Sequence, residues 1–296
     1  MISSGDVGTA DAGKSNTLKR ILSATVLILM LGIIFYLGML ASSILLVILG
    51  VLIIDEIDIN FLRQRRSTTV YFLAQSLFVF AMLFLVFRGS VQTFFWQLPL
   101  VVNFLCVIYL FFAPWGWGLG WGANTSIYRG VLPLIVAAFV FIQLSSLAAL
   151  LLCPSWQKLL FLLLVTVFSM DTGAWLIGKN FGRHKLCKKI SPKKSVEGLI
   201  GGIFFALVCA LMTIYFVLKE IVIHNNIIMI VIAILMIALI SHLGDLFQSK
   251  LKRQFNLKDS SDLIPGHGGV YDRVDSLIFV SPFYYLFVKY LLINRL

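Results

Sequence analysis

Charged residues are scarce in this sequence, and that scarcity argues against a soluble protein. Only 12% of the 296 residues are charged, whereas 60% are hydrophobic, and the mean hydropathy is +0.98. A soluble domain carries about 25% charged residues, so we expect an integral membrane protein. The apolar residues occur in long blocks rather than in short alternating segments, which favours transmembrane helices over a β-barrel.

Cysteines, histidines and internal repeats are also few or missing. The four cysteines, Cys106, Cys153, Cys187 and Cys209, show no paired spacing. Three of them lie in or beside apolar spans, and for that reason we interpret them as buried small residues. No other histidine or cysteine lies near His242 at a spacing typical of zinc sites. No internal repeat is visible, which argues against a transporter built from inverted repeats.

The apolar blocks predict the number of membrane spans. A helix needs about 20 mostly apolar residues to cross a bilayer. Residues 21–54 form one apolar run broken only by Gly38 and Ser42–Ser43, and we divide it in two because one helix of that length is too long. The fold class that we predict is an all-α polytopic membrane protein with about nine transmembrane helices, at residues 21–37, 40–57, 69–87, 92–113, 129–152, 156–178, 197–218, 226–248 and 276–293.

The basic residues predict the orientation of these spans. With nine spans and a cytoplasmic N-terminus, most of the 24 lysines and arginines lie in cytoplasmic segments, as the positive-inside rule requires. The net charge of +11 then lies along one membrane face. We expect it to attract anionic lipids and nucleotides rather than nucleic acid.

The most polar stretch of the chain runs from Ser249 to Asp275. Its glycine-rich turn, residues 265–269, precedes a predicted helix, where consecutive backbone N–H groups can bind phosphate oxygens. Asp272 and Asp275 lie three residues apart and share one face of that helix, as carboxylates that bind a metal ion would. Carboxylates for a hard cation beside groups that bind phosphate indicate phosphoryl or nucleotidyl transfer.

Polar residues also interrupt two of the predicted spans. Asp171 lies inside the span at 156–178, and a carboxylate at the bilayer centre costs roughly 2.5–3.5 kcal/mol, so it usually marks function. Along the helix that includes 226–248, polar side chains fall within an arc of about 140°, so this face should line a hydrated cavity. We expect His242 in this stripe to be a hydrogen-bonded neighbour rather than a metal ligand. The stripe consists of Ser241, His242, Asp245, Gln248, Ser249, Lys252 and Arg253.

These segments resemble the motifs of the phosphatidate cytidylyltransferases, also called CDP-diacylglycerol synthases. The Ser249–Asp275 stretch matches S-x-L-K-R, K-D-x-S and I-P-x-H-G-G-V-x-D-R-V-D in that order. Upstream, D-T-G-A begins at Asp171, S-P-K-K-S-x-E-G begins at Ser191, and G-D-L-x-x-S ends at Ser249. Many members have Glu where this chain has Gln248, so we assign Gln248 no role in metal binding.

The resemblance implies transfer of CMP from CTP to phosphatidate, giving CDP-diacylglycerol and pyrophosphate, with Mg²⁺ and with or without a second cation. It also implies a homodimer in a bacterial inner membrane, with the active site facing the cytoplasm. Metal binding falls to Asp245 and Asp272, helped by Asp275 and Asp171. The residues assigned to catalysis are Asp245, Asp272, Lys193, Lys194 and Arg273, and those assigned to nucleotide or phosphate binding are Ser191, Lys193, Lys194, Ser249, Lys252, Arg253, Gly266, His267, Gly268 and Gly269.

On this basis the chain divides into three parts: a disordered cytoplasmic tail (1–17), an N-terminal transmembrane region (18–128) and a C-terminal catalytic transmembrane region (129–296). We expect Glu56, near the end of a span, to reach the membrane interface, with a contact to the catalytic region as the alternative. Two other functions stay open. One is a related CTP-using lipid enzyme, such as a polyprenol kinase or an archaeol-type cytidylyltransferase, and the more distant one is a transporter.

Overall fold

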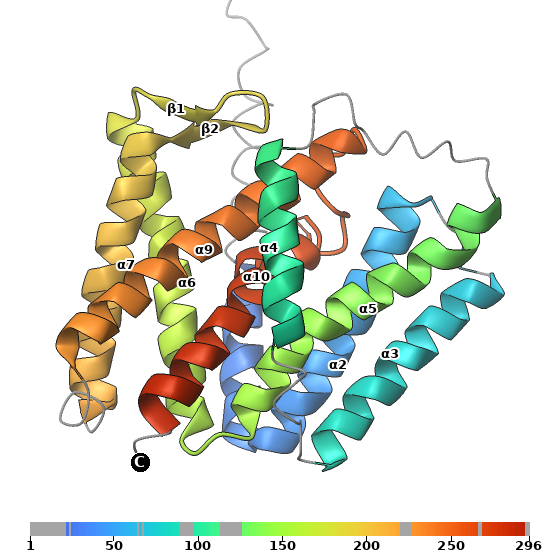
Figure 1. Ribbon diagram of the computed structural model, residues 1–296, viewed down its shortest axis with the longest axis horizontal. Coiled ribbons are helices and arrows are strands. Elements are labelled where there is room, and N and C mark those ends of the chain that lie inside the picture. Colours follow the sequence, from blue (N-terminus) through green and yellow to red (C-terminus); the bar gives the residue numbers. More distant parts are fainter. Residues whose placement is uncertain are drawn as a thin grey trace, which may run out of the picture.

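The structure, a computed structural model, describes residues 22–23, 25–63, 65–66, 68–88, 97–112, 126–219, 226–265 and 268–293. The predicted tail 1–17 lies outside them. The described chain is mainly helical (Figure 1). Its helices are an apolar segment Thr25–Leu37, α2 (Met39–Glu56), α3 (Thr69–Arg88), α4 (Gln97–Phe112), α5 (Ser126–Leu151), α6 (Trp156–Phe181), α7 (Val196–Val217), α9 (Ile227–Gln254) and α10 (Tyr271–Phe287), with π-helical turns η1 (Ile57–Phe61) after α2 and η3 (Val288–Ile293) after α10.

A helix lies in each of the nine ranges that the apolar blocks predicted. Six of the described helices are long and apolar enough to cross a membrane, and their candidate spans begin at Met39, Thr69, Val131 (within α5), Trp156, Val196 and Ile227. The segment Thr25–Leu37, α4 with 16 residues and α10 with 17 residues are shorter. The structure thus supports a helical membrane protein, and the count of nine spans stays a prediction.

A small β-hairpin is the one departure from an all-α fold among the named elements of the described chain. Strand β1 (Lys185–Cys187) pairs antiparallel with β2 (Ser191–Ser195). β2 leads directly into α7, where the Ser195 hydroxyl caps the helix by accepting a hydrogen bond from Gly198 N at 3.1 Å. The sequence pattern did not reveal the hairpin because strands of three and five residues show too little periodicity.

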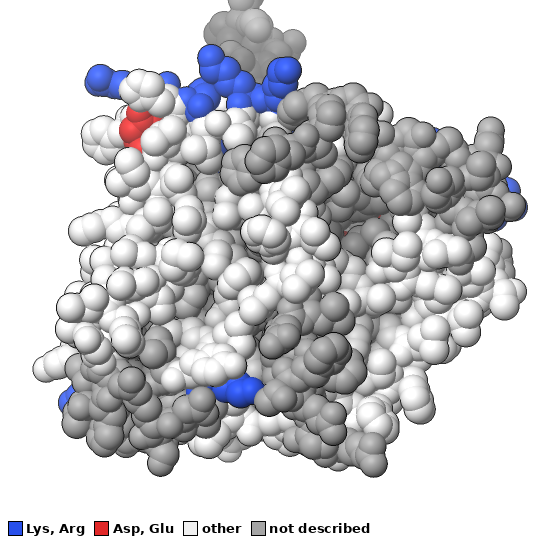
Figure 2. Space-filling model, in the orientation of Figure 1, with Lys and Arg blue, Asp and Glu red and all other residues white. Residues whose placement is uncertain are grey.

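The hairpin end of the molecule is basic. Figure 2 shows lysine and arginine side chains gathered at this end, above a broad belt of uncharged surface. Lys185, Lys188 and Lys189 of the hairpin segment are exposed, and so are large apolar side chains of the belt such as Phe204 and Phe216. An apolar belt beneath a basic rim suits a bilayer whose surface is anionic.

Helices α6 and α7 pack closely because glycines line their contact. A Cβ at Gly198 would lie 2.8 Å from Ala174 O, and a Cβ at Gly202 would lie 2.7 Å from Met170 O. Small residues allow this kind of approach between membrane helices. The close packing brings the start of α7, and with it β2, next to the part of α6 that carries Asp171.

Buried amides hold the centre of the bundle together. Asn103 of α4 donates to Phe279 O of α10 at 2.7 Å, and Gln143 of α5 donates to Asn103 Oδ1 at 2.5 Å. Both amide side chains are completely buried. Hydrogen bonds between helices in an apolar interior fix how the helices sit against each other, so this network positions α10.

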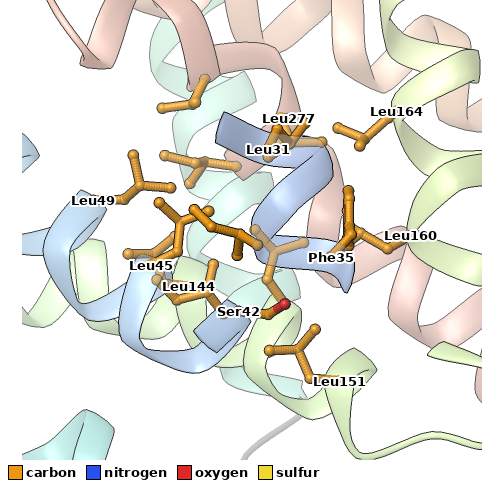
Figure 3. A pocket seen from close by; sticks show the side chains of 15 residues that line it. Leu31, Phe35, Ser42, Leu45, Leu49, Leu144, Leu151, Leu160, Leu164 and Leu277 are labelled. Atoms are coloured by element: carbon orange, nitrogen blue, oxygen red, sulfur yellow. The ribbon is translucent and has the colours of Figure 1, made fainter. Parts of the chain in front are cut away.

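An apolar cavity borders one face of α10 (Figure 3). It lies between the segment Thr25–Leu37, α2, α5, α6 and α10, and α10 contributes Val274, Leu277 and Ile278. Ser42 is the polar side chain in its lining, and its hydroxyl already donates to Gly38 O at 3.0 Å. The lining therefore offers hydrocarbon contacts and no group suited to phosphate.

Candidate active site

A polar cavity of about 380 Å³ lies between the hairpin and helices α6, α7, α9 and α10. The polar cavity and the apolar cavity are lined by different faces of α10. All of the residues that the sequence assigned to metal binding and catalysis line the polar cavity, together with Ser191, which was assigned to phosphate binding alone. They are Asp171, Ser191, Lys193, Lys194, Asp245, Asp272, Arg273 and Asp275.

Asp245 projects from the polar face of α9 toward the hairpin. Its Oδ2 lies 2.6 Å from Lys194 Nζ, and the Ser249 hydroxyl lies 3.4 Å from its Oδ1. Beyond this ion pair, Lys194 Nζ has no hydrogen-bond partner in the part of the chain that the structure describes. An ammonium carries three donors, so Lys194 can bind a phosphate while still next to Asp245.

His242, one turn before Asp245 on α9, also lines the cavity. Its side chain is buried, but Nε2 has no hydrogen-bond partner among the described residues. The expectation of a hydrogen-bonded neighbour is therefore not met at Nε2. A buried, unpaired ring nitrogen at a cavity wall can bond to a substrate or to water.

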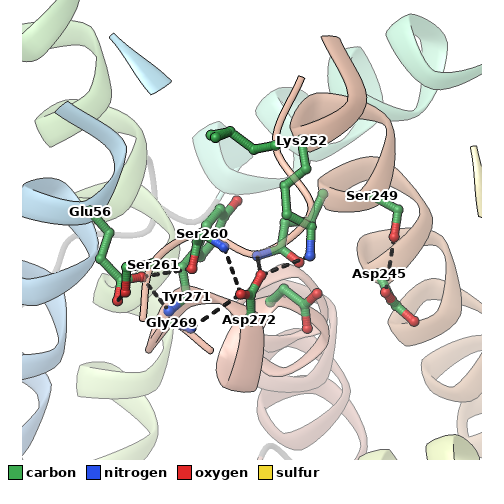
Figure 4. A network of polar contacts seen from close by, with 12 residues as sticks. Glu56, Asp245, Ser249, Lys252, Ser260, Ser261, Gly269, Tyr271 and Asp272 are labelled. Atoms are coloured by element: carbon green, nitrogen blue, oxygen red, sulfur yellow. Dashed lines mark hydrogen bonds and ion pairs between the residues drawn. The ribbon is translucent and has the colours of Figure 1, made fainter. Parts of the chain in front are cut away.

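Asp272 is already surrounded by donors (Figure 4). Its Oδ1 accepts from Lys252 Nζ at 2.7 Å and from Gln248 Nε2 at 3.1 Å. Its Oδ2 accepts from the backbone N–H groups of Ser260 at 2.7 Å and Gly269 at 3.2 Å. The carboxylate, with 4% of its side chain exposed, ties the 260–269 loop to α9. Metal binding by Asp272 would have to displace some of these donors.

These donors also decide how Asp272 titrates. Burial raises the pKa of Asp272, but the hydrogen bonds from Lys252 and from the Ser260 and Gly269 backbone outweigh it, so the pKa is lower than usual. A carboxylate with a lowered folded-state pKa stabilises the fold above its unfolded-state pKa of about 3.9, and this stabilisation is lost as the pH falls further.

We therefore expect the stability difference between the wild type and Asp272→Asn to be constant above about pH 5 and to shrink below about pH 4. Thermal unfolding in detergent with EDTA, measured at a series of pH values, checks this. A difference that stays constant down to pH 3 would show that the ionised Asp272 contributes nothing to the fold.

The remaining two aspartates lie close to Asp245. Burial and the neighbouring charges of Asp245 and Asp171 raise the pKa of Asp275 well above its usual range. Within the described residues, no three acidic, histidine or cysteine side chains are close enough to hold a metal ion together. Mg²⁺ commonly binds through one or two carboxylates plus substrate phosphates. Asp245 with one of the other two aspartates therefore suits Mg²⁺ in the presence of substrate phosphates, and the ion would relieve the repulsion between the carboxylates.

Comparison with known proteins shows the family of the chain. The model of the cytidylyltransferase family matches residues 18–291. The chain belongs to the cytidylyltransferase family. It is 47% identical over 136 residues to a phosphatidate cytidylyltransferase of Haemophilus influenzae, a match that covers 45% of this chain and 47% of the relative. It is 45% identical over 121 residues to a protein of the same name from Bacillus subtilis, with 41% and 44% covered. The matched part spans slightly less than half the length of these curated relatives.

Several residues expected to bind nucleotide in this cytidylyltransferase-family chain do not line the polar cavity. Lys252 binds Asp272, and Arg253 donates to Leu257 O at 3.2 Å. In the glycine-rich turn, Gly268 N donates to Ile264 O at 3.1 Å, and Gly269 N donates to Asp272. The N–H groups of Gly268 and Gly269, which were predicted to bind phosphate, thus donate within the protein. Ser249 also lies outside the lining, although its hydroxyl contacts Asp245, and Gly266 and His267 lie outside the described residues.

Glu56 corrects the sequence interpretation most clearly (Figure 4). Instead of reaching the interface, its buried carboxylate accepts hydrogen bonds from Val270 N at 2.7 Å and Tyr271 N at 2.9 Å, at the start of α10. It also accepts from the hydroxyls of Ser260 at 2.9 Å and Ser261 at 2.6 Å. A carboxylate at a helix N-terminus satisfies free N–H groups and opposes the helix dipole.

Glycine is required next to this contact. A Cβ at Gly269 would collide with Ser260 Oγ and would lie 2.7 Å from Glu56 Oε2. Packing against Ser260 and Glu56 therefore requires glycine at position 269, and the motif alone did not indicate this requirement. The signal that could have revealed Glu56 was an acidic residue at the end of a long apolar run, which is costly to bury without donors.

Proposed function

We propose that this protein is a CTP:phosphatidate cytidylyltransferase, which transfers CMP from CTP to phosphatidate and releases pyrophosphate. One observation carries the proposal: the polar cavity joins Asp171, Asp245 and Asp275 to Lys193, Lys194 and Arg273. Carboxylates and cations facing each other across one cavity suit a reaction between two phosphates. The names of the relatives support the choice of substrates.

In this reaction an oxygen of the phosphatidate phosphate attacks the α-phosphorus of CTP. The new bond forms there as the bond to the oxygen bridging the α- and β-phosphorus breaks, and pyrophosphate leaves with that electron pair. A phosphate monoester has a second pKa of about 6 and is already anionic near pH 7. It needs alignment and neutralisation of charge rather than a strong general base.

The protein's own residues provide that alignment. Lys193 and Lys194 would hold phosphates from the hairpin side, and Arg273 from the start of α10. Arginine can bind two phosphate oxygens at once, which fixes the orientation of the group it holds. Mg²⁺ would be held by one or two of the predicted ligands Asp245, Asp272, Asp275 and Asp171 together with substrate phosphates, and it would supply additional neutralisation of the phosphate charge.

The decisive test uses CTP labelled at two different positions. Purified protein with phosphatidate, Mg²⁺ and α-labelled CTP should move label into the lipid phase, and γ-labelled CTP should leave its label in water as pyrophosphate. Label from γ-labelled CTP in the lipid would indicate a lipid kinase. No transfer from either, with counterflow uptake in proteoliposomes, would indicate a transporter.

We also propose nine spans, a cytoplasmic N-terminus and a homodimer in a bacterial inner membrane. The basic hairpin end supports the orientation, and resemblance supports the dimer. Mass determination by light scattering in detergent tests the dimer, since a monomer would refute it.

We expect the hairpin and the 254–270 loop to face the cytoplasm. A variant that retains only Cys187, in β1, reports on the hairpin, and Asp262→Cys in a cysteine-free chain reports on the loop. Both should react with an impermeant maleimide only after the cytoplasmic side is opened. Labelling of either from outside intact cells would disprove the orientation.

A further inference from the structure

One wall of the polar cavity is exposed on the surface of the protein. Asp171 and Trp175 of α6 line the cavity. Both are also exposed, and Trp175 keeps 62% of its surface. On the opposite side, the lining residues His242 of α9 and Ser276 of α10 are each only 4% exposed. The cavity therefore has an opening past α6, in addition to the exposed lining residues Lys193 of the hairpin and Arg273 at the start of α10.

This opening lies within a helix that can cross the membrane. α6 is 26 residues long and ends at Phe181, next to the basic hairpin. At 1.5 Å per residue, Trp175 lies about 9 Å and Asp171 about 15 Å along the helix from that end. In a bilayer this range runs from the headgroup level to the first part of the acyl chains. An indole suits that zone, because one part of the ring system is apolar and its N–H is polar.

A lysine is positioned directly above this tryptophan. Lys179 Nζ lies 4.9 Å from the centre of the Trp175 ring, one turn closer to the helix end. This cation–π contact holds the ammonium over the ring, at the mouth of the opening. Inside the cavity, Lys193, Lys194 and Arg273 continue the positive charge. A lipid with an anionic headgroup would meet a cation at the mouth and more cations inside.

We propose that Trp175 and Lys179 form the membrane-side mouth through which the lipid substrate reaches the cavity. Trp175 packs against the glycerol and ester region of phosphatidate, and Lys179 contacts its phosphate as the headgroup passes. Both act as positioning residues for the lipid, and neither contacts CTP. The choice of phosphatidate rests on the proposed function.

The test separates the two substrates in steady-state kinetics with phosphatidate in mixed micelles. Trp175→Ala should raise the KM for phosphatidate about tenfold, the change that corresponds to losing roughly 1.4 kcal/mol of packing. Lys179→Gln should raise it several-fold, and more at low than at high salt. The KM for CTP should stay unchanged in both variants, and Trp175→Phe and Lys179→Arg should restore most of the affinity for phosphatidate.

A matched control exists at the far end of the neighbouring helix α7, where Tyr215 lies in the last turn and Lys219 follows the helix. Lys219 Nζ lies 5.7 Å from the centre of the Tyr215 ring, and Tyr215 is also 62% exposed, but neither residue lines the polar cavity. Tyr215→Ala and Lys219→Gln should leave the KM for phosphatidate unchanged. Equal increases in both pairs would show a general effect of membrane anchoring and would overturn the proposal.

Two further results would also overturn it. An unchanged KM for phosphatidate in Trp175→Ala would show that the lipid does not contact this residue. Efficient disulfide formation between two copies of a Trp175→Cys variant would show that a second copy covers this face. If the wild-type protein transferred no CMP to phosphatidate, the proposed function itself would fail, and with it the identity of the lipid.

Discussion

Asp245→Asn is expected to fold and insert normally but to lose catalytic turnover by about 10²–10³-fold. Asparagine has nearly the same shape as aspartate but lacks the charge that holds Lys194 at 2.6 Å and that a hard cation requires. The measurement is kcat for CMP transfer, with thermal unfolding in detergent as the check on folding. Asp262→Asn, an exposed aspartate of the 260–269 loop, is the matched control and should keep full activity.

Near-normal turnover in Asp245→Asn would remove Asp245 from the site. The double variant Asp245→Asn/Asp272→Asn tests whether the two residues share one role. If both residues bind one metal ion, as the sequence predicts, the double variant should be scarcely worse than either single one. The contacts of Asp272 with the Ser260 and Gly269 backbone favour a separate role in ordering the loop. That role would give losses that multiply, together with a lower unfolding temperature.

Glu56→Ala is expected to destabilise the protein by on the order of 3 kcal/mol and to reduce activity with it. The change leaves the N–H groups of Val270 and Tyr271 and two serine hydroxyls without their acceptor. Because these groups lie at the start of α10, the displacement reaches Asp272 and Arg273. The unfolding temperature in detergent and kcat/KM for both substrates are the measurements.

The adjacent Asp55 provides the control for Glu56. Asp55 pairs with Arg66 at 2.7 Å, and the Arg66 side chain is 69% exposed. Exposed ion pairs contribute about 0–1 kcal/mol, so Asp55→Asn should change stability little. If Glu56→Ala lowers stability no more than Asp55→Asn does, the contacts of Glu56 with α10 do not stabilise the protein.

The sequence predicted much of the site because its chemistry follows local periodicity. Asp245 and the polar stripe on α9 share one helix face, and Asp272 and Asp275 lie one turn apart on α10. Residues at these spacings share one face wherever the segment forms a helix, so the sequence alone predicts their proximity. Asp171 was recognisable because a carboxylate is costly inside an apolar span. The polar cavity brings these residues together with Lys193 and Lys194.

What the sequence could not show were partners far apart along the chain. The glycine-rich turn predicts N–H groups for phosphate, but Ile264 and Asp272 accept those of Gly268 and Gly269. Lys252 was expected to bind phosphate, and the structure pairs it with Asp272, a partner that its position in the sequence did not indicate. Spacing fixes which face of a helix a side chain occupies, but it does not fix which residue of another helix lies opposite. For the same reason the contact between Glu56 and α10 was only an alternative.

The contact around Gly269 has a consequence for how related sequences can change. Glu56 and Ser260 are 204 positions apart, yet Ser260 donates to Glu56, and both fill the space that a side chain at position 269 would need. Substitution at one of these positions alters the volume and charge left for the other two. Across related chains, we therefore expect positions 56, 260 and 269 to vary together, so that a residue larger than glycine at 269 accompanies a shorter side chain at 56 or 260.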